Sequence, residues 1–137
     1  MKIFLDTSSL IKLYCRETDT EHIESVFVKN EVEAIFISEI AFVEFESSLW
    51  KKVREKDITA SESSEIIRIF DSELYKYFDL PIDSNLLRSA RGLIATHGIS
   101  GLRSLDSIQL ATALLIREDC DLFVASEYTI IDCDNYH

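Results

Sequence analysis

The chain has 137 residues, a length that suits one domain built around one hydrophobic core. Hydrophobic residues make up 47% and charged residues 28%, as in globular proteins, and no apolar run approaches the roughly 18 residues of a membrane span. The net charge of −11 argues against holding nucleic acid by general electrostatic attraction, because phosphate contacts need Lys and Arg. It does not exclude an enzyme that acts on nucleic acid through metal ions, and it suits a basic protein partner.

Cysteine usage and the N-terminal residues predict the compartment. Cys15, Cys120 and Cys133 are odd in number and have no metal-binding spacing, so we interpret them as reduced thiols. The first residues hold one Lys and a short strand-like run before an acid, which is unlike a signal peptide. We expect a cytoplasmic protein, with residues 1–137 forming a single domain and no membrane association.

The pattern of apolar and polar residues predicts short strands separated by helices. In chain order we expect a strand at 2–6, helices at 8–15 and 20–29, a strand at 33–37, helices at 39–55 and 60–78, a strand at 79–82, helices at 84–97 and 104–118, and strands at 122–125 and 130–133. Such an order predicts the α/β class: a three-layer α/β/α sandwich with a central, mainly parallel sheet of four to five short strands.

The predicted sheet brings two acidic residues to one edge. Asp6 ends the first strand, and Ser126 and Glu127 directly follow the strand at 122–125. A charge at the end of a buried strand must be paired, hydrated or bound to metal, because burying it bare is costly. Ligand sites in parallel sheets lie at the carboxyl ends of the strands, so both positions are candidates for a site.

Two further acids interrupt helices that are otherwise apolar or small. Glu44 lies in IAFVEFESSLW, where helical phase favours it over Glu46 as the inward-facing acid. Asp106 is the only charge in LDSIQLATALLI. Structural alternatives stay open, because an acid in a first helical turn satisfies free N–H groups, and Glu127 beside Ser126 fits a helix N-cap.

Convergence of these four acids would require a cation. Two unit charges about 4 Å apart repel by about 1 kcal/mol in water and about 4 kcal/mol at an effective dielectric of 20. Several such pairs rival the net stability of a small domain, roughly 5–15 kcal/mol. An all-oxygen ligand set suits Mg²⁺ or Mn²⁺. The histidines, His22, His97 and His137, fall in polar or terminal segments, and we expect them on the surface.

Four segments in the same order resemble the PIN-domain nucleases, in particular the VapC-like toxin ribonucleases of bacterial and archaeal toxin–antitoxin pairs. The segments are LDTSSLIKLY, ISEIAFVEFESSLW, LDSIQLATALLI and DLFVASEYTI. The resemblance covers essentially the whole chain. It implies an acidic pocket that binds one or two Mg²⁺ or Mn²⁺ ions, and endonucleolytic cleavage of RNA by metal-activated water.

The resemblance also implies a role for each acid. The catalytic and metal-binding residues would be Asp6, Glu44, Asp106 and Glu127. The supporting hydroxyls would be Ser8 or Thr7 beside Asp6, and Ser126. Two features depart from the family. Its last motif usually reads Thr-x-Asp, whereas this chain has Ala125-Ser126-Glu127. We also expect the residues after Glu127 to be too few for a full helix together with a fifth strand.

The family usually forms homodimers and binds an antitoxin whose basic side chains enter the acidic pocket, which the acidic balance of this chain suits. Arg88, Arg91 and Arg103 are candidates for RNA contact, by analogy with the family. Two alternatives stay open. One is a PIN nuclease that acts in RNA maturation or on DNA without an antitoxin, and the other is a non-catalytic acidic module that binds protein.

Overall fold

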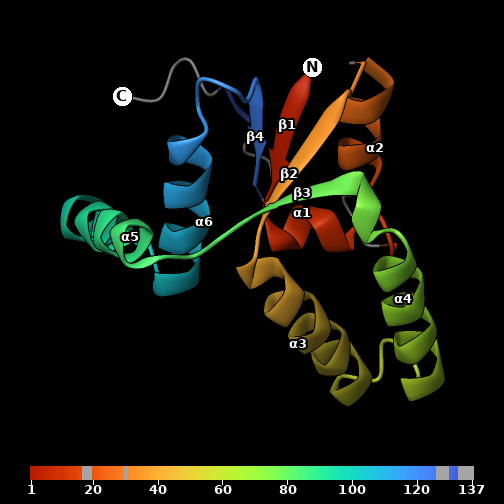
Figure 1. The fold of residues 1–137 in the computed structure, drawn as a ribbon. Helices are drawn as coiled ribbons and strands as arrows, with labels where there is room; N and C mark the ends of the chain where they lie inside the picture. The colour runs from red at the N-terminus through yellow and green to blue at the C-terminus, as the bar shows by residue number, and fades with distance from the viewer. Residues whose placement is uncertain (17–19, 30, 126–129, 133–137) are drawn as a thin grey trace.

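A computed structural model describes residues 1–16, 20–29, 31–125 and, for the backbone, 130–132 (Figure 1). Its elements in chain order are β1 (Lys2–Leu5), α1 (Thr7–Ile11), α2 (Thr20–Lys29), β2 (Ala34–Ser38), α3 (Ile40–Arg54), α4 (Ala60–Ser72), the 3₁₀ helix η1 (Leu74–Lys76), β3 (Tyr77–Leu80), α5 (Ser84–His97), the 3₁₀ helix η2 (Gly98–Ser100), α6 (Ser104–Leu115), β4 (Leu122–Val124) and β5 (Ile130–Asp132). In the part of the chain described, no helix is both long and apolar enough to cross a membrane.

The strands form one sheet in the order β3-β2-β1-β4-β5. The first four are parallel, and β5 runs antiparallel to β4. The central strand β1 pairs with both neighbours, with Ile3 opposite Ile35 and Phe4 opposite Phe123. The carboxyl ends of four strands therefore share one edge of the sheet, which confirms the predicted α/β class with its mainly parallel sheet.

Side chains of β1 alternate between two hydrophobic clusters, as the period of a strand requires. Ile3 and Leu5 are fully buried among residues of α1, α2, α3 and α4, whereas Phe4 packs with Phe123 and Ala113 on the other face. In Figure 1, α5 and α6 lie on one side of the sheet and α1 and α2 on the other. This arrangement is the predicted three-layer sandwich.

Helices α3 and α4 pack against each other as a hairpin that extends away from the sheet (Figure 1). Thr59 starts α4 with a capping box, in which its side chain and that of Glu62 each accept a hydrogen bond from the other's backbone N–H. Phe45 of α3 stacks on Phe70 of α4 at a ring-centroid distance of 4.1 Å. The base of the hairpin thereby joins the core under α1.

One element differs clearly from its prediction. The helix expected at 60–78 ends at Ser72, and η1 and β3 occupy the remaining residues. Tyr77–Leu80 pairs in parallel with 35–38 of β2. This pairing favours a strand at these residues over a continuation of the helix. Several other predictions are close: α2 has the expected bounds, α5 begins after Asp83, whose side chain caps it, and the strand at 130–132 is present.

A polar network links the end of α1 to η1 and β3. The Tyr14 hydroxyl donates to Glu73 at 2.9 Å and shares a hydrogen bond of 2.5 Å with the Tyr77 hydroxyl, while Lys76 lies 2.9 Å from Glu73. Burial, followed by the bond to Tyr77, holds the pKa of Tyr14 far above its ordinary value. Burial also raises the pKa of Tyr77.

These raised pKa values predict a loss of stability at alkaline pH. Both phenols are protonated in folded and unfolded chains below about pH 10, so their stabilisation is fully present there. Above that pH the unfolded chain releases their protons first, and we expect the free energy of unfolding to fall as pH rises. Tyr14→Phe should make this fall shallower in urea unfolding from pH 8 to 11. Tyr75→Phe, at an 81% exposed position, is the control that should match wild type; equal slopes for the two variants would contradict the prediction.

Candidate functional site

Asp6 lies where the central strand β1 ends and α1 begins. Its backbone N–H donates to the Val124 carbonyl, which continues the pairing of β1 with β4 by one residue. Its Oδ1 accepts hydrogen bonds of 2.9 Å from the Ser9 backbone N–H and from the Ser8 hydroxyl. Asp6 is thus the N-cap of α1, and the Ser8 hydroxyl bonds to it, whereas the predicted role of Ser8 at the site stays a prediction.

Glu44 faces the same region from the first half of α3. It is partly buried, whereas Glu46 is exposed, so the predicted choice between the two acids is confirmed for orientation. Its Oε1 accepts a hydrogen bond of 2.9 Å from the Thr7 hydroxyl and another of 2.9 Å from the Gln109 side-chain amide of α6. Thr7 adjoins Asp6, so the two predicted acids are joined through one residue.

Asp106 lies in the first turn of α6, and its side chain is exposed. No side chain caps this helix, so the favourable interaction of an acid with the helix dipole accounts for part of its placement. Gln109 is three residues further along and therefore on the same side of the helix. The structure thus places Asp106 on the helix that contacts Glu44, one turn away from the contact itself.

The fourth predicted acid, Glu127, and its neighbour Ser126 lie outside the described residues. They follow β4, which pairs directly with β1. Their roles as ligand and supporting hydroxyl stay predictions.

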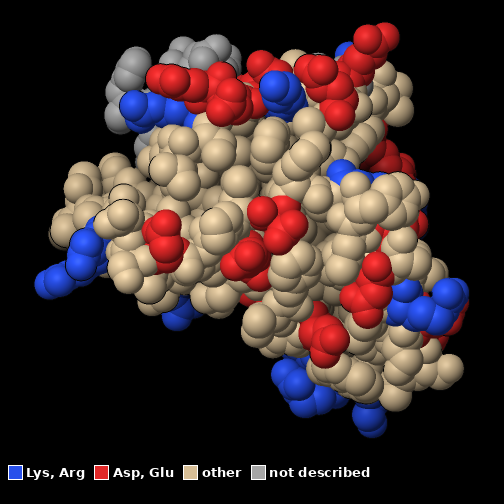
Figure 2. Space-filling view, in the orientation of Figure 1, with Lys and Arg blue, Asp and Glu red and all other residues tan. Residues whose placement is uncertain are grey.

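On the face shown in Figure 2, a small group of acidic side chains lies near the middle, others lie along the upper edge and the right side, and the basic side chains lie mostly around the margin. Among the described residues, no group of three His, Cys, Asp or Glu side chains lies close enough to hold a metal ion. Mg²⁺, however, is usually held by one or two carboxylates together with waters and substrate phosphates. Asp6 and Glu44 offer carboxylate oxygens, the type of ligand that such an ion binds. Glu44 Oε2 has no hydrogen-bond partner among the described residues.

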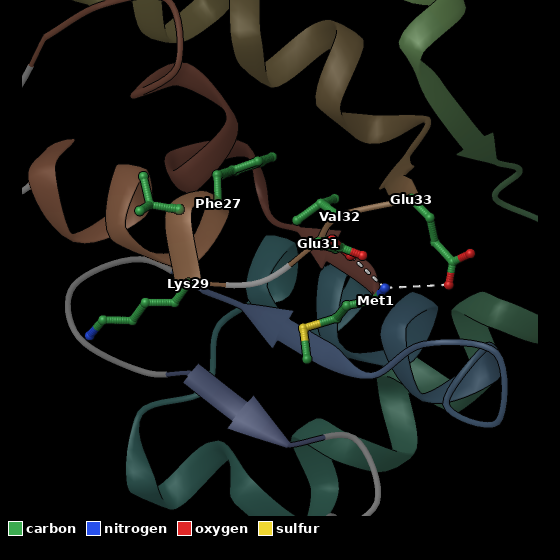
Figure 3. Close-up of a pocket in the computed structure, with 7 residues that line it drawn as sticks. Met1, Phe27, Lys29, Glu31, Val32 and Glu33 are labelled. Atoms are coloured by element: carbon green, nitrogen blue, oxygen red, sulfur yellow. Dashed lines mark hydrogen bonds and ion pairs between the residues drawn. The ribbon is translucent and has the colours of Figure 1, made fainter.

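A separate hollow lies at the opposite end of β1 (Figure 3). There the Met1 amino group donates to the Glu31 carbonyl at 2.6 Å and lies 3.3 Å from Glu33 Oε1. The Glu33 carboxylate is paired with this amino group. The hollow lies at the other end of β1 from Asp6, so it is not part of the site at the carboxyl edge.

Two residues near the site were not singled out by the sequence. Glu39 follows β2 at the carboxyl edge and is exposed. Gln109 is 4% exposed and bonds to both Thr7 and Glu44. A signal for Gln109 was present, since it is the only long polar side chain of SIQLATALLI and follows Asp106 by one helical turn.

Sheet order and site define an α/β domain with Asp6 at the carboxyl end of its central parallel strand and with Glu44 bonded to the next residue, Thr7. The model of the PIN domain family matches residues 3–128, and the chain belongs to that family. A comparison with curated protein sequences finds no match.

Solved structures share the fold at low sequence identity. The crystal structure of Mycobacterium tuberculosis VapC20, a sarcin–ricin loop cleaving toxin, has a TM-score of 0.67 and 14% identity, covering 91% of this chain and 89% of that chain. VapBC2 from Rickettsia felis, bound to a DNA fragment from its promoter, has a TM-score of 0.57 and 16% identity, covering 88% and 84%. FitAcB from Neisseria gonorrhoeae has a TM-score of 0.61 and 19% identity, covering 81% and 79%.

Proposed function

We propose that this protein is a divalent-metal-dependent endoribonuclease that acts as the toxin of a toxin–antitoxin pair. The observation that carries the proposal is the meeting of α1, α3 and α6 at the carboxyl end of β1, where Thr7 and Gln109 both bond to Glu44 beside Asp6. Membership of the PIN-domain family and the fold shared with VapC20 support the same function.

The proposed metal-binding residues are Asp6, Glu44, Asp106 and Glu127, and the ion is Mg²⁺ or Mn²⁺. Such an ion supplies a nucleophilic water at neutral pH and neutralises charge on the phosphoryl oxygens. The chain's own contribution is to orient its acids. Ser8 and the Ser9 backbone hold Asp6 through hydrogen bonds to Oδ1, and Thr7 and Gln109 hold Glu44 through hydrogen bonds to Oε1. We expect cleavage to leave a 5′-phosphate and a 3′-hydroxyl, as the family resemblance implies.

A few basic residues would contact the RNA, although the net charge of the chain is −11. Arg103, directly before α6 and three residues from Asp106, is exposed, as are Arg88 and Arg91 of α5. Exposed guanidinium groups and a metal ion would both bind the phosphates of an unpaired RNA strand. Single-stranded or looped RNA is therefore the proposed substrate class.

The partner surface proposed for an antitoxin lies on the α3–α4 hairpin. Phe42, Val43 and Trp50 of α3 are exposed by 36%, 68% and 38%, and Tyr75 of η1 by 81%. Acids Glu46 and Asp71 line the same shallow groove as Phe42, so a basic amphipathic segment would complement it. A homodimer in the cytoplasm completes the proposal, as the family resemblance implies.

RNA cleavage by purified protein tests the proposed function. We expect cuts in looped RNAs, including a ribosomal sarcin–ricin stem-loop, with Mg²⁺ or Mn²⁺ and none with EDTA, and mapping of the ends should give 5′-phosphates. Cleavage of DNA alone would favour a different PIN nuclease. Absence of both cleavage and Mn²⁺ binding at millimolar concentration would favour the non-catalytic acidic module. A neighbouring gene for a DNA-binding protein that neutralises the activity would identify the antitoxin.

A further inference from the structure

The Gln109 side chain closes a triangle of hydrogen bonds between three elements. Its Nε2 donates to Thr7 Oγ1 of α1 at 2.9 Å and to Glu44 Oε1 of α3 at 2.9 Å. The Thr7 hydroxyl donates to the same Glu44 oxygen, also at 2.9 Å. Both hydrogens of the amide and the one hydroxyl hydrogen are thereby used, and every donor is directed to the carboxylate or to the hydroxyl that holds it.

Two of the three side chains in the triangle are buried, and Glu44 is partly buried. Thr7 is 5% and Gln109 4% exposed. The Gln109 amide can face the carboxylate in one way only, because the opposite orientation would turn its carbonyl oxygen toward the acceptor oxygen of Glu44.

This orientation leaves the Gln109 carbonyl oxygen buried and without a hydrogen-bond partner among the described residues. An unsatisfied buried acceptor destabilises the folded chain, and an apolar residue of similar size would avoid that cost. Buried polar groups of this kind require a specific explanation. Stability alone does not supply it, whereas a requirement on Glu44 does.

The requirement concerns the second oxygen of Glu44. Oε1 accepts two hydrogen bonds, while Oε2 has no partner among the described residues. A carboxylate held through one oxygen presents the other in a fixed position. A bound cation then does not have to order a flexible Glu side chain, which would cost conformational entropy. Partners that orient a metal ligand typically contribute 10–100-fold to metal affinity.

We propose that Gln109 is a positioning residue that, together with Thr7, fixes the Glu44 carboxylate through Oε1 so that Oε2 meets the divalent cation. The proposal rests on the proposed function and deepens it. It assigns a role at the site to an uncharged residue, in addition to the four acids.

Mn²⁺ binding to the full chain, measured by electron paramagnetic resonance, tests the proposal without RNA. We expect Gln109→Leu, which keeps the size but loses both donors, to weaken Mn²⁺ binding 10–100-fold. The Mg²⁺ concentration for half-maximal RNA cleavage should rise by a similar factor, while metal-free thermal stability stays near wild type or rises. Gln109→Met has the same expected result and serves if the leucine variant does not fold. Thr112→Val is the control, since Thr112 is equally buried in α6 but bonds only to its own helix.

A double-mutant cycle shows whether Gln109 acts through Glu44. In a Glu44→Gln background, Gln109→Leu should cause no further change in Mn²⁺ affinity. Wild-type affinity in both Gln109 variants, or an equal loss with and without Glu44, would overturn the proposal while wild-type binding and cleavage still upheld the proposed function. A wild-type protein that neither binds Mn²⁺ nor cuts RNA would overturn both.

Discussion

We expect Asp6→Asn to abolish the proposed RNA cleavage, with a loss of about 10³-fold or more in rate, while the domain stays folded. A loss of this size is typical when a group that acts directly on transition-state charge is removed. Asn keeps the acceptor oxygen that receives the Ser9 N–H and the Ser8 hydroxyl, so the cap of α1 is retained. The measurement is a single-turnover cleavage rate in Mg²⁺, together with urea unfolding.

Asp6→Ala is the matched variant that separates the N-cap role of Asp6 in α1 from its proposed role in RNA cleavage. It should be equally inactive and, in addition, less stable by about 1 kcal/mol, because the N-cap acceptor is gone. Should Asp6→Asn cut RNA within tenfold of the wild-type rate, the assignment of Asp6 to the metal site is wrong.

Phe45→Ala should lower the free energy of unfolding by about 3–5 kcal/mol, a large fraction of the roughly 5–15 kcal/mol expected for a small domain. Phe45 is 1% exposed, stacks on Phe70, and meets the Tyr14 ring edge-on at 5.6 Å between centroids. Its removal leaves a cavity where α1, α3 and α4 meet. Urea unfolding followed by tryptophan fluorescence of Trp50 measures the loss.

Phe42→Ala is the control on the same helix, because the Phe42 side chain is 36% exposed. We expect a cost of about 1 kcal/mol or less, since little buried surface is lost. Equal losses at the two positions would mean that the base of the hairpin does not belong to the core. Each variant's RNA cleavage, measured where the protein is fully folded, should stay near wild type, since neither side chain bonds to Asp6 or Glu44.

The fold was predictable because its strands are short apolar runs bounded by polar residues. The run IFL before Asp6 is fully buried on both faces of the sheet, as such a pattern indicates. The end of α4 was not predictable by the same means. Residues 60–80 contain neither Gly nor Pro, so no local signal ends the helix at Ser72. Pairing of β3 with β2, a non-local contact, decides that boundary.

The positions of two candidate site residues, although not their roles, could be predicted from the conflict between burial and charge. Asp6 and Glu44 are acids in apolar company, and the structure brings them together through Thr7. The sequence did not distinguish which acid Thr7 supports, because that depends on where α3 packs relative to α1. Thr7 bonds to Glu44, whereas Ser8 bonds to Asp6. Gln109 was missed because the prediction looked for charged side chains among apolar residues, and the amide of Gln109 is uncharged.

The Thr7–Glu44–Gln109 triangle joins residues 37, 65 and 102 positions apart in the chain. During synthesis on the ribosome, the nascent chain therefore has no complete triangle until Gln109 has left the exit tunnel and α6 has docked on the sheet. A truncated or stalled translation product that ends before α6 holds Thr7 and Glu44 without Gln109, the partner that they share. For the ribonuclease proposed above, activity would then begin only once nearly the whole polypeptide has been made.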